Sequence, residues 1–597
     1  MGQNQMDLHR RSRVLYRRSA RAGGVRPPAA APPDLGDLHR QHLDNIARLE
    51  RTRQKAAVQR IGIDEPDKDI LSLRPPAFWI RHQAVPLEML GRTALVLMAD
   101  PASLAALRQD LRGQFDEVIP IPTPAAEIEA ILLRALQAQM TREAARSVAP
   151  ALSCRSFDYR AARAPAFATG TLLCLFSILA PHLVTAVLAV AALVTLLMFT
   201  ALRISGLLAA ARPDQPKSET PKDLPQMSML VPLYREAEIG KHLLRRLCRL
   251  TYPRDRLEVL LVLEENDDVT RNAVKCADLP DWFRVVEVPG DGTLTTKPRA
   301  MNYALNFCRG EIIGIWDAED APAPDQLESA ASAFAHAPPD VVCFQGILDF
   351  YNPSRNLISR CFTLEYAGWF RVLLQGIARL GLVIPLGGTT LFIRRDALEQ
   401  LGAWDAHNVT EDADLGVRIA RAGYRTEMLP TTTYEEANSR ITPWIKQRSR
   451  WLKGFMMTYL VHMRAPKALL RDVGWRRFWG LQAFFLGTLG QFLLAPVLWS
   501  FWLVALGVSH PLETSLPRDM LSVAVGALVF FEVLNLCIWY CGARASERPV
   551  LAFCAPLMPL YFILGCFAAY KALWEVFAAP FFWDKTAHGD HGGTTEH

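Results

Sequence analysis

The chain has 597 residues, of which 50% are hydrophobic and 21% charged, and its net charge is +6. This length allows several domains, and the low charged share indicates membrane segments. The modest net charge argues against a dedicated nucleic-acid-binding protein, so no nucleic-acid partner is expected. The eleven cysteines are scattered without a CxxC pair, which indicates neither a zinc site nor a disulfide framework. The N-terminus lacks an apolar core segment, so we expect no cleavable signal peptide.

The first part of the chain divides by composition into two segments. Residues 1–40 are rich in Arg, Pro and Ala, and we expect a disordered basic leader that touches anionic lipid. Residues 41–148 carry alternating helix-like and strand-like patterns, which predict a small α/β domain. Its expected elements are helices at Gln41–Arg60, from near Pro101, and at Pro124–Gln139, and strands at Ala94–Met98 and Ile119–Pro122.

A long apolar segment follows this domain. Residues 166–202 contain no Asp, Glu, Lys or Arg, a length that suits two short membrane-spanning helices joined at Pro181-His182. Basic residues flank both ends and are absent from the turn, which favours a hairpin with both ends in the cytoplasm. We therefore expect a transmembrane hairpin at residues 164–208; a buried soluble helical pair is the alternative.

Residues 222–465 alternate between strand and helix patterns, as in an α/β domain. Buried strands are predicted at Ser228–Leu233, Val259–Leu263 and Ile312–Trp316. Acidic clusters follow the last two of these strands directly. Because open α/β sheets bind ligands at the carboxyl ends of their strands, we expect these carboxylates to lie at a binding site.

Two later stretches carry further charged residues. Three carboxylates lie within Glu411–Asp414, immediately ahead of a helix-like run. They fit either a catalytic cluster or an acidic helix cap, since carboxylates complement the helix dipole. Gln447–Trp451 is basic, amphipathic and carries an indole, a pattern that membrane-surface helices share.

The C-terminal part is again apolar. Runs of spanning length cover Phe478–Leu506, Leu521–Tyr540 and Val550–Val576, so transmembrane helices are expected over residues 476–580, followed by a tail at 581–597. The first run contains Pro496 and fits a span alone or a span plus an interfacial helix. The number of spans, and the side of the membrane on which the tail lies, stay open.

Within residues 41–148, three short segments resemble the N-terminal domain of type II secretion and pilus ATPases. They are Val85-Pro86-Leu87, the Ala99-Asp100-Pro101 turn and Glu127-Ile128. Some members of that family bind cyclic di-GMP, in an Arg-Leu-Gly-rich stretch that Arg60-Ile61-Gly62 represents at most. The resemblance implies a regulatory domain with a cyclic dinucleotide as the first candidate ligand.

Six motifs in residues 231–451 resemble the membrane-integrated family 2 glycosyltransferases with a GT-A fold, which include cellulose, hyaluronan and poly-N-acetylglucosamine synthases. In family order they are Val231–Glu236, Glu264-Glu265, Thr296–Asn302, Asp317–Asp320, Thr410–Asp412 and Gln447–Trp451. Glu264 stands where the family usually has Asp. The resemblance implies an α/β GT-A catalytic domain between multi-pass transmembrane helices.

The resemblance also assigns roles that suit the residue types. Asp317 with Glu319 or Asp320 would hold Mg²⁺ or Mn²⁺, since hard cations prefer carboxylate oxygens. Asp412 would be the base that activates the acceptor hydroxyl, with Glu411 and Thr410 beside it. Trp451, Gly387 and Gly388 would form the acceptor site. The donor would be bound by Pro232, Tyr234, Glu236, Glu264, Glu265, Lys297, Arg299, Asp317, Gln447, Arg448 and Arg450.

The expected function is an inverting, processive hexosyltransferase (EC 2.4) of the bacterial inner membrane. It would polymerise a UDP-sugar into a β-glucan-like or amino-sugar exopolysaccharide and translocate it, with the catalytic and N-terminal domains cytoplasmic. Its expected partners are the UDP-sugar, the growing glycan, membrane lipids and cyclic di-GMP. The alternatives are a sugar transferase acting on polyprenyl phosphate and a catalytically inactive receptor or scaffold. A glycoside hydrolase also uses paired carboxylates but needs no phosphate-binding Lys and Arg.

Overall fold

The computed structural model describes residues 66–211, 221, 223–237, 243–290, 292, 294–510, 512–513 and 518–582. The predicted basic leader, the predicted helix at Gln41–Arg60 and all but the first two residues of the predicted tail lie outside the described residues.

The N-terminal domain is built on a three-stranded sheet, β1-β2-β3. β1 (Ala84–Leu90) pairs antiparallel with β2 (Thr93–Met98), which pairs parallel with β3 (Glu117–Pro122). The predicted strands β2 and β3 are confirmed, whereas β1 was not predicted. The helices are α3 (Lys68–Leu71), α4 (Pro76–His82), α5 (Leu104–Asp110), which a short 3-10 turn at Pro101–Ser103 precedes, and α6 (Ala125–Arg146).

Helix α6 forms because apolar residues recur every fourth position and make one buried stripe. Ile128, Leu132, Leu136 and Met140 lie on this stripe and are almost fully buried. The predicted helix at Pro124–Gln139 is confirmed and continues for seven further residues. The chain then makes two single 3-10 turns, Pro150–Leu152 and Cys154–Ser156, before the first apolar helix.

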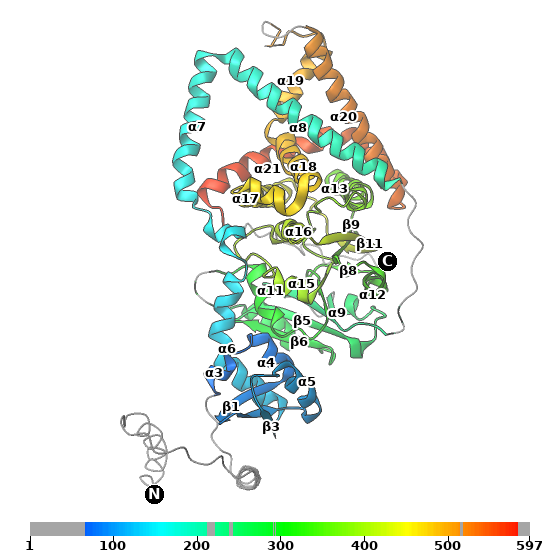
Figure 1. Ribbon diagram of the computed structural model, residues 1–597. Helices are drawn as coiled ribbons and strands as arrows, with labels where there is room; N and C mark the ends of the chain where they lie inside the picture. The colour runs from blue at the N-terminus through cyan, green and yellow to red at the C-terminus, as the bar shows by residue number, and fades with distance from the viewer. Residues whose placement is uncertain are drawn as a thin grey trace, which may run out of the picture. The chain divides into compact units, whose positions relative to one another are not determined.

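The catalytic-domain candidate is an α/β unit around an eight-stranded sheet of order β6-β5-β4-β7-β10-β9-β11-β8, which confirms the predicted class (Figure 1). β6, β5, β4 and β7 run parallel, while β10 is antiparallel to both β7 and β9. The strands are β4 (Met227–Leu233), β5 (Leu257–Glu264), β6 (Phe283–Val288), β7 (Ile312–Ile315), β8 (Ala321–Pro322), β9 (Val341–Phe350), β10 (Leu391–Arg394) and β11 (Arg425–Glu435).

The central strands form because they are continuous apolar runs, which suits a sheet that is covered on both faces. In β5, every residue but Glu258 is buried. The helices of this unit are α9 (Leu243–Leu247), α10 (Asp268–Lys275), α11 (Lys297–Leu305), α12 (Gln326–His336), α15 (Arg395–Gln400) and α16 (Glu411–Arg421). The parallel strands end at one edge, so the loops after β4, β5 and β7 meet there.

A layer of helices lies between this sheet and the long apolar helices (Figure 1). It contains α13 (Leu357–Gly368), a π-helical turn at Trp369–Leu373, α14 (Leu374–Arg379) and α17 (Ile441–His462). α13 packs on α20 (Arg518–Ala545), and α17 packs on α21 (Met558–Ala578). Because α17 carries the predicted Gln447–Trp451 motif, this layer joins the candidate site to the apolar helices.

Four helices among the described residues are long and apolar enough to span a membrane, or five if one bent pair is a single span. They are α7 (Tyr159–Leu179), α8 (Pro181–Ala210), α20, and a 3-10 segment at Pro549–Leu557 that runs into α21. The bent pair is α18 (Pro466–Leu493) and α19 (Ala495–Ala505), which meet at 67°. The break between α7 and α8 falls at Ala180, one residue before the predicted turn.

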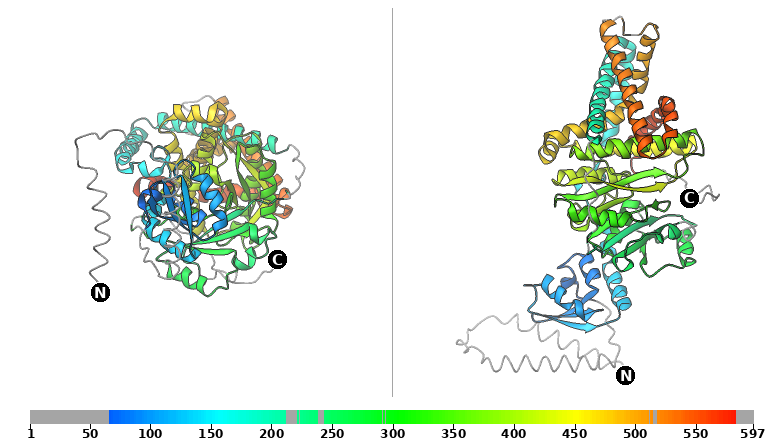
Figure 2. Two further views of the ribbon diagram at one scale, coloured as in Figure 1. Left: turned by 60° about the horizontal axis from the view of Figure 1, so that its bottom comes forward. Right: turned by 90° about the vertical axis from the view of Figure 1, so that its right-hand side faces the viewer.

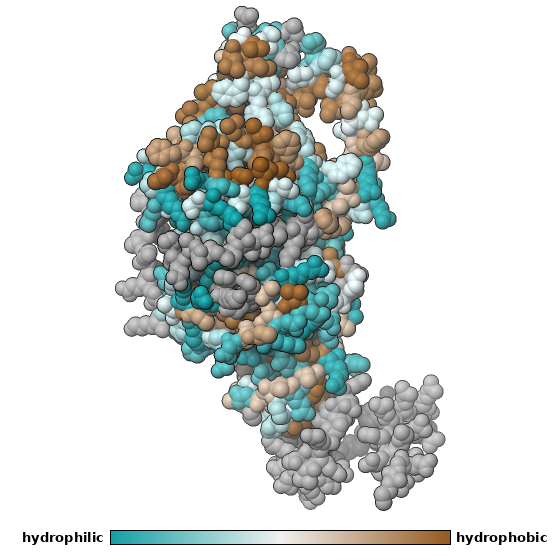
Figure 3. Space-filling view, turned by 180° about the vertical axis from the view of Figure 1, so that it is seen from behind, coloured by the Kyte–Doolittle hydropathy of each residue, from teal (hydrophilic) through white to brown (hydrophobic). Residues whose placement is uncertain are grey.

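These helices expose apolar side chains on their outer faces. Figure 3 shows the hydrophobic residues gathered over them, whereas polar residues prevail over the α/β unit. Figure 2 (right) shows α8 and α20 running alongside each other, and the two helices are in contact. Exposed apolar surface of this extent on long helices is what a lipid environment favours.

Candidate active site

Three predicted segments meet at the carboxyl edge of the sheet. Lys297 Nζ, at the start of α11, donates to Asp317 Oδ1 at 2.5 Å and to the carbonyl oxygen of Gly388 at 3.1 Å. Burial alone would lower the pKa of Lys297, but the charges of Asp317, Glu411 and Asp412 outweigh it, and the pKa is raised. This lysine therefore stays charged and ties together the segments of three separate motifs.

The predicted metal motif contains two partly exposed carboxylates and one buried carboxylate. Asp320 is fully buried and its Oδ2 accepts hydrogen bonds from the Asp317 N–H at 2.8 Å and from the Thr389 hydroxyl. Burial, followed by the charges of Asp317 and Glu319, raises the pKa of Asp320 well above its usual range. Asp320 thus braces the loop, and Asp317 and Glu319 are the motif's partly exposed carboxylates.

No group of three or more His, Cys, Asp or Glu residues in the described part of the chain is close enough to form a complete metal site. Two carboxylates nevertheless suit Mg²⁺ or Mn²⁺ in a phosphoryl-containing complex, because phosphate oxygens and water complete the coordination. The donor set of Asp317 and Glu319 fits such an ion.

Glu435 is a further acidic residue at this edge that the sequence analysis missed. It ends β11, and its carboxyl group lies near Asp320, Glu319 and Asp317. Burial and then these three charges raise the pKa of Glu435 well above its usual range. An acidic residue at a strand end was the signal that singled out Asp317, and the same signal could have found Glu435.

Asp412 lies in the first turn of α16, one residue after Glu411. Burial raises the pKa of Asp412 to about 6, partly offset by the Ala413 N–H and by Lys297. Burial and then the Asp412 charge raise the pKa of Glu411 to about 8. The pKa of Glu411 thus lies above that of its neighbour Asp412, and Asp412 is the more exposed of the two.

Gly388 closes the site over Asp412. Its φ is +83°, and a Cβ atom placed there would lie 2.9 Å from Asp412 Oδ2. The neighbouring Gly387 donates its N–H to Gln345 Oε1 at 2.8 Å, and a Cβ there would press on Leu348 and Phe370. Both glycines are therefore needed for close approach, and Gly388 also for its backbone conformation.

The two arginines of the Gln447–Trp451 motif face different sides of α17, since positions two apart on a helix differ by about 200°. Arg450 faces the acidic edge: burial lowers its pKa, and Glu411, Asp317 and Asp412 partly restore it. Arg448 instead donates two hydrogen bonds to the Glu365 carboxylate, from Nη1 to Oε1 at 2.8 Å and from Nη2 to Oε2 at 2.6 Å. Arg450 is thus the arginine of this motif that lies near the acidic residues, while Arg448 is paired with Glu365.

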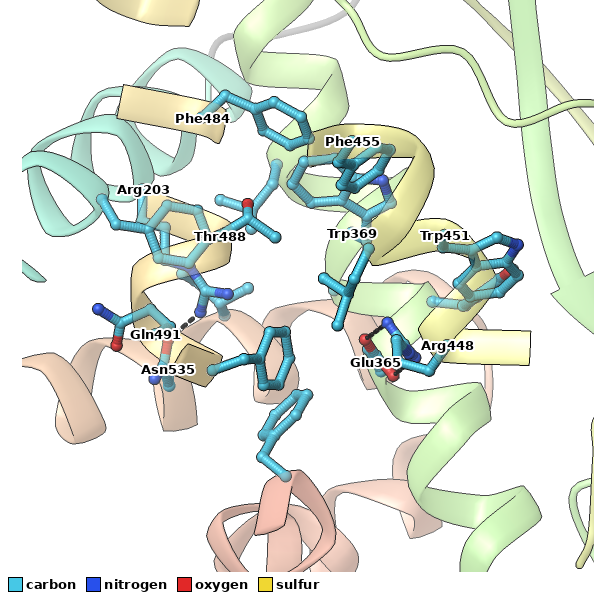
Figure 4. A pocket seen from close by; sticks show the side chains of 18 of the residues that line it. Arg203, Glu365, Trp369, Arg448, Trp451, Phe455, Phe484, Thr488, Gln491 and Asn535 are labelled. Carbon is cyan, nitrogen blue, oxygen red and sulfur yellow. Dashed lines mark hydrogen bonds and ion pairs between the residues drawn. The ribbon is translucent and has the colours of Figure 1, made fainter. Parts of the chain in front are cut away.

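A cavity of about 250 Å³ begins beside Asp412 and continues among the apolar helices (Figure 4). Thr410, Gly387, Arg448 and Trp451 line its inner end. Trp451 packs against Phe362 and Tyr366, and Arg448 lies 5.0 Å from the centre of its ring. Arg203, Thr488, Gln491 and Asn535 line the other end, and the aromatic side chains of Trp369 and Phe455 lie between the two ends.

The remaining predicted donor residues contact neighbours within the α/β unit and the helix layer. Arg299 Nη1 and Glu264 Oε2 form a buried ion pair at 3.3 Å, which joins the first turn of α11 to the end of β5. The exposed Glu265 accepts the Gly290 N–H at 3.0 Å. Pro232 belongs to β4, Tyr234 and Glu236 follow that strand, and Gln447 accepts from Asn438 at 2.9 Å.

Comparisons with known proteins found two matching family models and several similar proteins. Residues 225–454 match the family model described as glycosyltransferase like family 2, and residues 57–142 match that of the MshEN domain. A probable glycosyltransferase of Bacillus subtilis, YdaM, is 26% identical over 238 residues, which are 40% of this chain and 56% of that protein. The beta-monoglucosyldiacylglycerol synthase of Trichormus variabilis is 29% identical over 282 residues, 46% of this chain and 58% of that protein.

A solved structure, the mannosyltransferase PcManGT from Pyrobaculum calidifontis in complex with GDP-Man and Mn²⁺, is also similar. It shares 20% identity at a TM-score of 0.41, over 62% of this chain and 99% of that one. The chain spans between 56% and 58% of the length of the two curated relatives named above. Residues 225–454 are a family 2 glycosyltransferase domain with a GT-A-like α/β fold, and residues 57–142 are an MshEN domain, as the resemblance to secretion-ATPase N-terminal domains implied.

Proposed function

We propose that the chain is an inverting hexosyltransferase that takes a sugar from a UDP-sugar and adds it to an acceptor held in the cavity beside Asp412. One observation carries this proposal: residues of four separate motifs meet at the Asp412 end of the cavity. They are Lys297, Arg450 and the acidic residues Asp317 and Asp412. The cations suit a diphosphate, and Asp412 suits a hydroxyl group that must lose its proton.

In the proposed step, Asp412 accepts the proton of the acceptor hydroxyl while its oxygen attacks the anomeric carbon of the donor. The bond between that carbon and the diphosphate oxygen breaks, and UDP leaves with the electron pair. Arg450 and Lys297 stabilise the negative charge on the leaving diphosphate. A divalent cation held by Asp317 and Glu319 would neutralise part of the same charge. Attack opposite to the leaving group inverts the configuration at the anomeric carbon.

We propose further that the reaction is processive and that the product, an exopolysaccharide, leaves through the inner membrane. Two features support this: Trp451 offers a flat ring at the cavity's inner end, and the cavity continues between helices of spanning length. The arginine-rich flanks of the α7–α8 pair favour cytoplasmic catalytic and N-terminal domains. Labelling of a cysteine engineered beside Asp317 from the periplasmic side would contradict this orientation.

A lipid acceptor is the second candidate. The cavity is lined mainly by apolar side chains, and three relatives in the comparison are named beta-monoglucosyldiacylglycerol synthases. Incubating the purified protein with a panel of UDP-sugars and membrane lipids separates the candidates. Polymer that linkage-specific hydrolases degrade supports the first proposal, whereas a labelled sugar that extracts into organic solvent replaces it with the second.

Removing divalent cations is expected to abolish UDP release, because Asp317 and Glu319 offer only hard oxygen ligands. The measurement is UDP release in excess EDTA, followed by addition of Mg²⁺ or Mn²⁺, which should restore it. Mn²⁺ binding measured by electron paramagnetic resonance should weaken in Asp317→Asn. Undiminished UDP release in EDTA would exclude the metal.

Transfer activity is expected to fall as the pH drops below about 6. Asp412 works only as a carboxylate, and its pKa is raised to about 6, chiefly by burial. Protonation therefore removes the base on the acid side, and kcat/KM, which reports ionisations of the free enzyme, rises with pH through this value. The profile of kcat/KM between about pH 5 and pH 8 measures this rise, and UDP binding over the same range is the control. A kcat/KM independent of pH across this window contradicts the assignment.

The MshEN domain is proposed to regulate the transfer and to bind cyclic di-GMP. The match of residues 57–142 to the MshEN family model supports this proposal. Titrating cyclic di-GMP into the full-length protein should show saturable binding and a change in UDP release. Binding without any change in rate would reject regulation, and no binding would reject the ligand.

A further inference from the structure

The segment that follows helix α6 contacts both sides of the transfer site. This segment, residues 144–156, is called the strap; it comprises the end of α6 and the two 3-10 turns and leads directly into α7. It lies against the base loop, residues 402–410, which ends where α16 begins. The strap also contacts α11, whose first residue is Lys297.

Asn302 joins the strap to both of these elements. From α11, its side-chain amide donates to the carbonyl oxygens of Ala144 in the strap, at 2.9 Å, and of Trp404 in the base loop, at 2.7 Å. The same side chain accepts the Trp404 N–H at 3.0 Å and reaches Ser147 Oγ at 3.1 Å. Only 6% of Asn302 is exposed. A buried amide that makes four hydrogen-bonding contacts to three residues holds those residues in one arrangement.

Asp405 holds the strap to the base loop a second time. Its Oδ1 accepts the Ser153 hydroxyl at 2.7 Å and its Oδ2 accepts the Cys154 N–H at 2.6 Å. Asp405 and Ser153 are 2% and 1% exposed. Gly402 closes the contact: a Cβ atom there would lie 2.6 Å from the Ser147 carbonyl oxygen. The carboxylate is thus engaged entirely in shaping the loop.

The base loop passes this constraint to the catalytic residues. The Asn408 N–H donates to the Asp405 carbonyl oxygen at 3.0 Å, and the Thr410 N–H donates to Asn408 Oδ1 at 3.0 Å. Glu411 and Asp412 follow at once. On the other side, the Thr296 hydroxyl donates to the Ala406 carbonyl oxygen at 2.9 Å, next to Lys297. The loop therefore determines where α16 and α11 begin.

We propose that Asn302 and Asp405 are positioning residues that couple the N-terminal domain, through the strap, to Lys297 and Asp412. α6 is a single rigid helix whose first half is packed in the N-terminal domain and whose end is bonded to Asn302. Any displacement of α6 must move the start of α11 and the base loop, because both are bonded to the same strap. The proposal rests on the proposed function for its rate measurement alone.

The test compares Asp405→Asn and Ser153→Ala with a control, Tyr252→Phe, in full-length purified protein. The Tyr252 hydroxyl donates to the Pro225 carbonyl oxygen at 2.6 Å in the same α/β unit, ahead of β4 and so at the opposite edge of the sheet. Asn in place of Asp405 keeps the volume but has one accepting oxygen, whereas Asp405 accepts the Cys154 N–H on Oδ2 and the His407 N–H on Oδ1. Ser153→Ala removes one hydrogen bond and is the milder variant, less prone to unfolding.

Asp405→Asn is expected to lower kcat about tenfold and Ser153→Ala about threefold, with a donor KM within about twofold of wild type, the size that loss of one or two buried hydrogen bonds allows. Amide hydrogen exchange over residues 406–412 should accelerate in both variants. Tyr252→Phe should change neither quantity. Leu136→Ala, which loosens α6 inside the N-terminal domain, should accelerate exchange at 300–305 and 406–412 as well.

Unchanged kcat and exchange in Asp405→Asn and Ser153→Ala overturn the positioning role. Exchange that stays unchanged at the site in Leu136→Ala overturns the coupling to the N-terminal domain. A wild-type protein that releases UDP from no UDP-sugar contradicts the proposed function instead, and the exchange measurements then decide the coupling without it.

Discussion

Asp412→Asn is expected to lower glycosyl transfer by about 10²–10⁴-fold, the range typical for removing a general base. Asn has nearly the size of Asp and keeps most of its hydrogen bonding, but it accepts no proton at neutral pH. UDP binding should change little, because Lys297, Asp317 and Arg450 stay in place. The measurement is kcat for polymer or lipid product, alongside UDP affinity by calorimetry.

The competing explanation is that Asp412 only favours the start of α16 through the helix dipole. Asn is nearly as good as Asp at a helix N-terminus, so this explanation predicts almost full activity and stability within a few tenths of a kcal/mol. Asp396→Asn is the matched control, since Asp396 is an exposed acidic residue in the first turn of α15. Product formation by Asp412→Asn near the wild-type rate would reject the base.

The sequence could predict those site residues that the order of strands and helices places at the same edge of the sheet. Asp317 directly follows a buried parallel strand, and Lys297 and Asp412 begin helices beside the same sheet. Parallel strands end at one edge, so these motifs converge whatever the loops between them do. The helices α6 and α8 were predictable for a similar reason, because an apolar stripe or run is a local property of the sequence.

The details that the sequence could not show depend on which neighbour each side chain meets. Arg448 and Arg450 are equally basic in the sequence, and only the structure shows Glu365, 83 positions away, holding Arg448. Arg299 belongs to the motif of Lys297, and the structure shows that it is buried and forms an ion pair with Glu264. Asn302 meets the strap 158 positions away. Such contacts depend on how segments far apart in the sequence pack together, and the periodicity of apolar residues does not reveal this packing.

Gly388→Ala is expected to lower kcat about 10²-fold, because a misplacement of about 1 Å at a reacting group is enough for such a loss. The added Cβ would lie 2.9 Å from Asp412 Oδ2, closer than such atoms approach, so the carboxylate must move. The backbone also adds strain: at φ +83°, Ala is destabilised by about 1–2 kcal/mol relative to Gly. Thermal unfolding and kcat measure the two effects separately.

Gly423→Ala separates backbone strain from displacement of the base. Gly423 has φ +87°, close to that of Gly388, but nothing lies within 4 Å of its added Cβ. Its variant should lose about the same stability and keep its kcat, whereas Gly388→Ala should lose both. The double variant Gly388→Ala/Asp412→Asn tests whether both changes act on the same carboxylate. If they do, the two losses in kcat should not add. Additive losses would show that Gly388 acts on another group, such as Lys297, which donates to its carbonyl oxygen.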